Sequence, residues 1–147
     1  MNDQAQAELK KIFNGRFSTS ESTRANYARG EDTYDPVLSK AVVFPETNEE
    51  VSKILTLCNK HKIPVVPFGT GTSLEGNVVG NDKGITISLE KMNKILSVNA
   101  LDFDCRVQAC VTKEQLNEYL REDGVFFPID PGANAAIGGM ASTSASG

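Results

Sequence analysis

Residues 64–76 carry the most informative pattern of the sequence: Pro64-Val65-Val66-Pro67-Phe68-Gly69-Thr70-Gly71-Thr72-Ser73-Leu74-Glu75-Gly76. Its apolar, β-branched first part predicts a buried strand over residues 63–66. Glycines and hydroxyl side chains follow directly, and ligands of α/β sheets bind at the carboxyl ends of such strands. Because glycines let the backbone approach a phosphate closely, residues 69–76 are a candidate phosphate-binding loop. A plain glycine turn stays open as the alternative, because such turns are common for conformational reasons alone.

Two familiar phosphate-binding motifs do not fit this loop. A dinucleotide fingerprint G-x-G-x-x-G that starts at Gly69 would need glycine at the position of Leu74. A P-loop that starts at Gly71 reaches Gly76 at the right distance, but Asn77 then stands where the phosphate-binding lysine is required. The sequence therefore argues against a Rossmann turn and against an NTPase.

The sequence before the loop predicts a βαβ unit. Residues 41–44 form a compact apolar strand that Pro45 ends. Thr47 begins a helix, with Glu50 three residues later as its capping-box partner. The buried face of that helix is expected to hold Val51, Ile54, Leu55 and Cys58. An earlier amphipathic helix is expected over residues 3–14, with one face formed by Leu9, Ile12 and Phe13. The polar residues between these two parts, 15–40, are expected to be irregular.

The sequence after the loop predicts further strands and one more helix. Residues 85–89 and 105–111 alternate between apolar and other side chains, as half-buried strands do, and 95–98 form another short strand. Thr112 begins a helix with Gln115 as its capping-box partner, and Gly124 ends it. Antiparallel strands that follow a βαβ unit predict an α+β fold in two lobes.

Composition excludes several classes of function. The 147 residues carry 15 Lys+Arg against 19 Asp+Glu, a net charge of −4, which argues against a nucleic-acid surface. The longest apolar runs have four residues, against the roughly 18 that span a bilayer.

Three cysteines without a C-x-x-C pair predict no disulfide or zinc site and fit a reducing, cytoplasmic location. His61, the only histidine, is expected at a helix end without a catalytic role.

A second glycine-rich segment closes the sequence, from Asp130-Pro131-Gly132 through Gly138-Gly139-Met140 to Ser146-Gly147. Its small residues would let the backbone and hydroxyl groups contact a large, flat ligand. A flexible tail is the alternative, since Gly/Ser-rich ends are often disordered. The apolar residues 126–129 lead straight into the segment, which favours a docked segment over a solvated tail.

Together the two glycine segments resemble the FAD-binding domain of the vanillyl-alcohol oxidase and p-cresol methylhydroxylase (PCMH) type. The first loop, 64–76, is similar to the family's FAD pyrophosphate loop. Phe127-Pro128-Ile129-Asp130-Pro131-Gly132, followed by Ile137-Gly138-Gly139-Met140, is similar to its second flavin segment. Arg29-Gly30-Glu31-Asp32 fits the family as well. Within this superfamily the sequence most resembles the cytochrome-type D-lactate dehydrogenases and the glycolate oxidase D-subunit.

The resemblance implies a set of cofactor-binding residues. The first loop would hold the FAD pyrophosphate through Phe68, Gly69, Thr70, Gly71, Thr72 and Ser73. The flavin ring would lie beside Asp130, Pro131 and Gly132, and the path of the ring, ribityl chain and phosphates would be lined by Gly138, Gly139, Ser142, Ser144 and Gly147. Some relatives attach flavin to a histidine of the first loop. Thr72 takes that place here, which implies non-covalent FAD.

The implied fold is a two-lobed α+β fold, with an N-terminal βαβ lobe and an incomplete, mostly antiparallel second lobe. Residues 1–35 would form a helix and polar lead-in, and 36–147 an FAD-binding domain that is cut short. The implied activity is oxidation of a D-2-hydroxy acid, D-lactate first, by hydride transfer to FAD, with a cytochrome or quinone as electron acceptor. No catalytic or metal-binding residue is expected in this chain, and a full-length protein would be cytoplasmic or peripheral at a membrane. The alternatives are a non-catalytic remnant and the same half of a related FAD oxidase.

Overall fold

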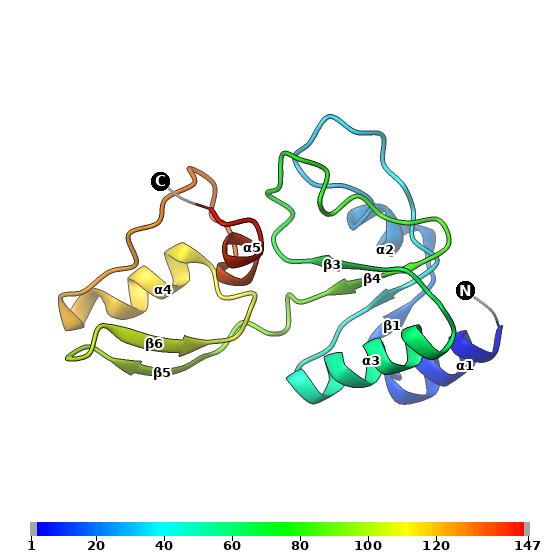
Figure 1. Cartoon of the computed structure of the whole chain (residues 1–147), viewed down its shortest axis with the longest axis horizontal. Coiled ribbons are helices and arrows are strands. Elements are labelled where there is room, and N and C mark those ends of the chain that lie inside the picture. The colour runs from blue at the N-terminus through cyan, green and yellow to red at the C-terminus, as the bar shows by residue number, and fades with distance from the viewer. Residues whose placement is uncertain (1–2, 146–147) are drawn as a thin grey trace. The chain divides into compact units, whose positions relative to one another are not determined.

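The computed structural model describes residues 3–145, which form two compact units that divide between Lys91 and Met92 (Figure 1). Unit 1 is a mixed four-stranded sheet with helices, and unit 2 is a β-hairpin with helices. The predicted α+β fold is therefore confirmed. No helix within the described residues is both long and apolar enough to cross a bilayer.

The sheet of unit 1 has the strand order β1-β2-β4-β3. Its strands are β1 (Phe17–Ser18), β2 (Val42–Val43), β3 (Val65–Phe68) and β4 (Ile85–Ser88). β4 pairs in parallel with both β2 and β3, while β1 pairs with β2 in antiparallel. The predicted βαβ unit forms, but β4 lies between its two strands. β3 also begins two residues later than expected, because Ile63 still donates its amide to Cys58 O at the end of the preceding helix.

The central strand β4 forms where the alternating residues 85–89 predicted a strand. All four of its residues are buried, the polar Thr86 and Ser88 included. The Oγ1 atom of Thr86 lies 2.8 Å from Ser39 Oγ, and Ser39 Oγ in turn accepts a hydrogen bond from the amide of Asn81. Parallel strands need cover on both faces, and here a polar pair supplies the contact on the second face. The alternating apolar and polar residues of β4 therefore face two buried surroundings: the apolar core on one side of the sheet and a polar contact on the other.

Two helices cover the first face of this sheet (Figure 1). They are α1 (Asp3–Ile12) and α3 (Asn48–Lys60). The core cluster of unit 1 joins these helices to β2 and β4 through Ala5, Leu9, Phe13, Ala41, Val43, Ile54, Leu57, Cys58, Ile63, Ile85 and Ile87. Two predicted core positions are wrong, because Ile12 and Leu55 are exposed. Leu57 takes the place expected of Leu55, since the buried stripe of α3 is rotated by part of a turn.

The segment expected to be irregular contains two short elements, β1 and the helix α2 (Glu21–Asn26). Ser20 caps α2 by accepting a hydrogen bond from the amide of Thr23. β1 was not predicted because two residues are too few to show an alternating pattern. It forms because β2 offers it an edge, where the amide of Phe44 donates to Arg16 O at 3.0 Å.

Arg16 also forms the strongest ion pair of unit 1. Its guanidinium donates to both carboxylate oxygens of Glu50, over 2.5 and 2.6 Å, with both side chains half-buried. These bonds hold the pKa of Glu50 at about 2. Thr47 caps α3 as predicted, but Glu50 accepts from the amide of Glu46 and does not close the capping box. The N-terminal segment is thereby bonded to the start of α3.

Unit 2 is built on the antiparallel hairpin of β5 (Ile95–Asn99) and β6 (Asp104–Val107). α4 (Lys113–Leu120), the 3-10 turn η1 (Arg121–Asp123) and α5 (Ile137–Ser142) complete it. Val111, Leu116 and Leu120 form its core, with partly buried Phe127 and Ile137 packed against them. Thr112 caps α4 and Gly124 ends η1 in the left-handed conformation, both as predicted. The strand predicted over 105–111 stops at Val107, so Cys110 lies in a turn, and α5 was not predicted.

We predict that Glu50→Gln lowers the free energy of unfolding by about 2 kcal/mol at pH 7, because it removes a charge-assisted, bidentate contact. The folded pKa of Glu50, about 2, lies below the unfolded value. The stabilisation is therefore complete above the unfolded pKa and is lost as pH falls toward 2. Urea unfolding of both proteins from pH 7 to pH 2.5 should show the difference shrinking over that range.

Glu46→Gln is the matched control for this prediction. Glu46 is exposed and lies 3.9 Å from Arg16 Nη1, so its contribution to stability is expected to be below about 0.5 kcal/mol. A Glu50→Gln difference that stays constant down to pH 2.5 would contradict the assigned cause.

Candidate functional site

The predicted phosphate loop begins where β3 ends, at Phe68. β2, β4 and β3 are parallel, so the loop lies at the carboxyl edge of the sheet, as the sequence predicted. Phe68 is buried, whereas residues 69–73 are exposed or half-buried. The strand thus holds one end of the loop in the core and leaves the glycine-rich part accessible to a ligand.

Gly71 has two reasons to be glycine. Its φ is +76°, in the left-handed region, and a Cβ there would lie 2.7 Å from Cζ of Phe68. Gly76, at the other end of the loop, also has a positive φ of +71°. The backbone of the loop therefore turns at Gly71 directly over the ring of Phe68, which no larger residue would allow.

The loop carries hydrogen-bond donors that no protein group uses. Among residues 3–145, no acceptor is found for the backbone amides of 70–74. The hydroxyl oxygens of Thr70 and Thr72 lie 3.4 Å apart, and Ser73 Oγ accepts from the amide of Glu75 and from Asn77 Nδ2. A run of free amides beside hydroxyl groups suits an anion with several oxygens, such as a phosphate or pyrophosphate. The loop therefore fits the group that the sequence predicted for it.

The second glycine segment begins with an anchored turn in unit 2. Asp130 accepts a hydrogen bond from Lys113 Nζ at 2.6 Å and another from the amide of Gly132 at 3.1 Å. The bond from Lys113 is the main cause that lowers the pKa of Asp130, and the bond from Gly132 adds to it. Gly132 has a φ of +83°, and Pro131 between them is exposed. The carboxylate thus fixes the turn of the three residues that the resemblance placed beside the flavin.

The two neighbouring glycines of α5 have different surroundings. A Cβ on Gly138 would lie 2.8 Å from both Cβ and O of Ala109, and the amide of Gly138 donates to that same oxygen. A Cβ on Gly139 would meet nothing within 4 Å. Gly138 is therefore needed for packing within unit 2, while Gly139 leaves open space beside the helix.

The remaining predicted residues lie at the end of α5. Ser142 is exposed and donates its hydroxyl to Gly138 O at 2.7 Å, which leaves the hydroxyl oxygen as an acceptor. Ser144 is exposed with a positive φ of +53°. Gly147 lies outside the described residues. The structure therefore groups residues 68–73 in unit 1 and residues 130–144 in unit 2.

The segment before the first loop contacts the loop backbone, which the sequence did not predict. Gly30 packs against the loop backbone, since a Cβ there would lie 2.7 Å from Gly71 O. The amide of Glu31 donates to the same oxygen at 3.0 Å. In the sequence of this segment, only the glycine at position 30 could have indicated a close backbone contact.

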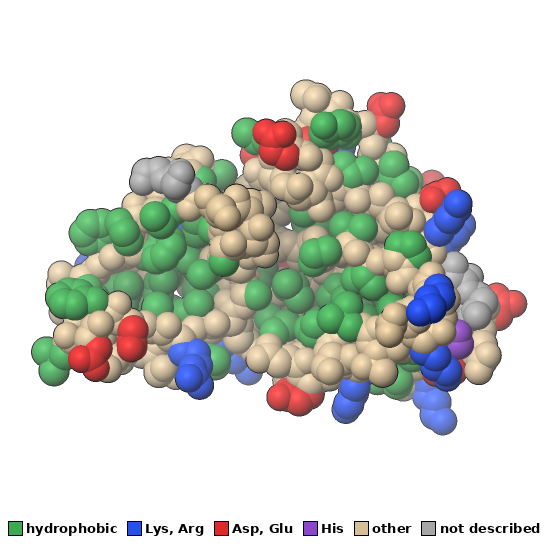
Figure 2. All heavy atoms as spheres, viewed as in Figure 1, with side chains coloured by type: hydrophobic (Ala, Val, Ile, Leu, Met, Phe, Trp, Pro, Cys, Tyr) green, Lys and Arg blue, Asp and Glu red, His purple; other side chains and the backbone are tan. Residues whose placement is uncertain are grey.

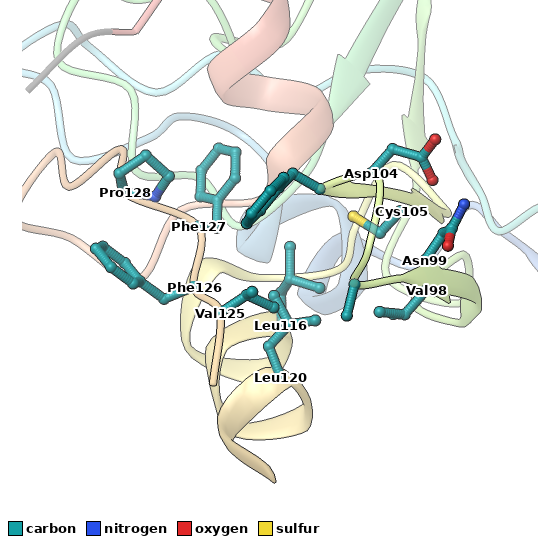
Figure 3. Close-up of a pocket in the computed structure, with 12 residues that line it drawn as sticks. Val98, Asn99, Asp104, Cys105, Leu116, Leu120, Val125, Phe126, Phe127 and Pro128 are labelled. Atoms are coloured by element: carbon teal, nitrogen blue, oxygen red, sulfur yellow. The ribbon is translucent and has the colours of Figure 1, made fainter. Parts of the chain in front are cut away.

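Unit 2 also contains an apolar groove of about 140 Å³ between the hairpin, α4 and residues 125–128 (Figure 3). Leu116, Leu120, Val125 and Phe127 form much of its wall, and Cys105 lines it from β6. Hydrophobic side chains also gather on the surface of this part of the chain (Figure 2), and the exposed fractions of Leu101 and Phe103 are 92% and 85%. The sequence did not predict this groove.

Within residues 3–145, no cluster of three or more metal-ligating side chains occurs.

We predict that Lys113→Met raises the pKa of Asp130 toward the ordinary aspartate value, because the hydrogen bond from Lys113 is the largest cause of its lowering. A carbon-detected NMR titration of the carboxyl group measures it directly. Lys94→Met, which removes an exposed lysine of unit 2, is the control and should leave the titration of Asp130 unchanged. An unchanged pKa in Lys113→Met would contradict the assignment.

Residues 39–147 match the family described as an FAD binding domain. The chain is 43% identical over 130 residues to a probable mitochondrial D-lactate dehydrogenase of Danio rerio, covering 88% of this chain and 26% of that protein. It is 38% identical over 143 residues to the mitochondrial D-lactate dehydrogenase [cytochrome] of Arabidopsis thaliana, covering 96% of this chain and 25% of that protein. The chain thus spans about a quarter of the length of these curated relatives.

Two solved structures show the same fold. Alkyldihydroxyacetonephosphate synthase matches with a TM-score of 0.90 at 22% identity, covering 100% of this chain and 33% of that chain. p-Cresol methylhydroxylase matches with a TM-score of 0.71 at 22% identity, covering 83% of this chain and 25% of that chain. With the family match, these confirm the resemblance drawn from the two glycine segments. The chain belongs to the FAD-binding domain family.

Proposed function

We propose that this chain is the FAD-binding part of a flavin-dependent dehydrogenase that oxidises a D-2-hydroxy acid, with D-lactate as the first candidate. The observation that carries the proposal is the loop after β3, whose amides from 70 to 74 have no acceptor among the described residues. Relatives named D-lactate dehydrogenase, at 43% and 38% identity, support the choice of substrate.

The residues of unit 1 would hold the pyrophosphate of FAD. In this proposal the amides and hydroxyls of residues 69–73 donate to its oxygens, and Phe68 supports the turn from below. The charge of the pyrophosphate suits a group of donors that lack an acceptor of their own. Unit 2 would contact the flavin ring through Asp130, Pro131 and Gly132. Its remaining cofactor contacts would be Gly138, Gly139, Ser142, Ser144 and Gly147.

We also propose that FAD is held without a covalent bond. Thr72 stands where some relatives have the histidine that attaches flavin. His61, the only histidine of the chain, ends α3 and so precedes β3, whereas the loop follows β3. The three steps along a strand of this length separate its two ends by about 10 Å. His61 therefore lies at the amino end of β3, whereas the loop lies at its carboxyl end.

Bound FAD supplies an acceptor for the hydride that leaves the α-carbon of the hydroxy acid. The part of this chain in that reaction is to bind and orient the cofactor. We assign neither the proton acceptor nor the substrate-binding groups to residues of this chain. A cytochrome is the proposed electron acceptor, because the names of three mitochondrial relatives include it, and a quinone is the alternative. The expected cytoplasmic location stays a prediction, since those relatives are named as mitochondrial.

We predict that Gly71→Ala weakens FAD binding at least thirtyfold, because the new methyl group meets the ring of Phe68 at a backbone conformation that favours glycine. Thr72→Val, which removes a hydroxyl donor at constant size, should weaken binding about three- to tenfold, as expected for the net loss of one ordinary hydrogen bond. Fluorescence quenching of FAD during titration with the apoprotein measures both.

Thr56→Val is the matched control, because Thr56 is exposed on α3 and the change is again isosteric. It should leave the affinity for FAD unchanged. Full affinity in both loop variants would contradict the placement of the pyrophosphate. A wild-type protein that binds no FAD would support the alternative of a non-catalytic remnant.

We predict that D-lactate gives the highest kcat/KM among D-lactate, L-lactate, glycolate and D-2-hydroxyglutarate. The assay uses the longest native polypeptide that contains this chain and follows reduction of cytochrome c. Glycolate and D-2-hydroxyglutarate are included because relatives at 30% and 29% identity are named for glycolate oxidase and D-2-hydroxyglutarate dehydrogenase. A higher kcat/KM with either would replace D-lactate in the proposal, and turnover with oxygen alone would favour an oxidase.

A further inference from the structure

We infer that residues 27–34 act as a clamp that positions the first glycine loop for FAD, with Tyr27 as its central positioning residue. This inference rests on the proposed function. The clamp precedes residue 39, where the match to the family begins, and none of its residues is among the cofactor-binding residues proposed above.

The backbone of the clamp contacts the loop from one side. The amide of Glu31 donates to Gly71 O at 3.0 Å. Gly30 packs so closely that a Cβ there would lie 2.7 Å from Gly71 O and 2.8 Å from Ser73 O. Two carbonyl groups of the loop are thus fixed against the clamp, on either side of Thr72. Because each peptide plane is rigid, fixing these carbonyls also fixes the amides that follow them.

A buried aspartate keeps the clamp in shape. Asp32 is buried and accepts hydrogen bonds from the amides of Gly30 and Tyr34, each at 3.0 Å. The ring of Tyr34 lies against the far end of the loop, where a Cβ on Gly76 would approach it to 2.8 Å. The clamp therefore touches the loop at both of its positive-φ glycines, through Gly71 O and at Gly76.

Tyr27 connects the clamp to the carboxyl ends of three strands. Its ring packs edge to face on Phe68, with centroids 5.1 Å apart, and on Phe44, with centroids 5.7 Å apart. Its hydroxyl donates to Glu90 Oε2 at 2.6 Å. Phe68 ends β3, Phe44 follows β2, and Glu90 follows β4. Tyr27 thus holds the Phe68 ring in the place where it supports the turn at Gly71.

The physical consequence is pre-organisation of the loop. A loop that must be ordered on binding loses conformational entropy, and that loss lowers its affinity. The clamp imposes the turn before the ligand arrives, so it raises affinity without touching the ligand. Loss of the clamp should therefore weaken every ligand that carries the pyrophosphate, ADP as well as FAD.

The experiment compares Tyr27→Leu with Tyr27→Phe in the longest native polypeptide that contains this chain, freed of FAD. Tyr27→Leu keeps the apolar bulk but removes the edge-to-face contacts, and should raise the Kd of both FAD and ADP about tenfold. Tyr27→Phe removes only the hydroxyl and should stay within threefold of wild type for both ligands. The thermal midpoint of the apoprotein, measured alongside, should fall by no more than a few degrees in Tyr27→Leu.

A second pair of variants tests the backbone contact. Gly30→Ala should raise both Kd values at least tenfold, whereas Glu31→Ala keeps its amide bond to Gly71 O and should change neither by more than twofold. Tyr119→Leu, at an exposed tyrosine on α4, is the control for loss of a ring. Two results would overturn the clamp: wild-type affinity in both Tyr27→Leu and Gly30→Ala, or weaker FAD with unchanged ADP. A wild-type protein that binds neither ligand refutes the proposed function itself, and the clamp is refuted with it.

Discussion

The requirement to bury β4 on both faces and both edges determines the architecture of unit 1. Its four residues are fully enclosed, so each edge needs a parallel neighbour and each face a cover. Parallel strands require crossover connections. α3 lies in the connection from β2 to β3, the two strands that flank β4. The carboxyl ends of three strands then meet at one edge of the sheet. The glycine loop lies at this edge because it follows the carboxyl end of β3, which pairs in parallel with β4.

At that edge, the proposed anion site would use closely packed backbone in place of charged side chains. Gly30 and Gly71 lie so near their neighbours that a methyl group on either would meet an atom at 2.7 Å. As a result, the amides of residues 70–74 have no acceptor within residues 3–145. A donor without an acceptor loses free energy when a bound ligand displaces its water. A ligand with several anionic oxygens offsets that loss by accepting hydrogen bonds from these donors. The net charge of −4 is therefore no obstacle to a locally favourable anion site.

Local chemistry made much of the fold predictable from the sequence. Thr47 and Thr112 capped their helices as predicted, and the strands around residues 42, 65 and 95 formed. The positions that failed depend on tertiary packing. Leu55 and Ile12 follow helical spacing yet are exposed, whereas Leu57 and Leu9 on the same helices are buried. The order of the strands, with β4 between β2 and β3, leaves no trace in local spacing. The place of the glycine loop after β3 was predictable, whereas the contact of the loop with residues 27–34 was not, because that contact joins segments about forty residues apart.

The first forty residues show that the part of a protein that evolves as a recognisable family and the part that folds as one body need not coincide. The family match begins at residue 39, yet Leu9 and Phe13 lie in the same cluster as Ile54 and Ile85, and Arg16 is bonded to Glu50. Removing everything before residue 39 would uncover the part of the core that α1 covers and leave Glu50 without Arg16. A boundary drawn by sequence similarity would therefore cut through a single hydrophobic core.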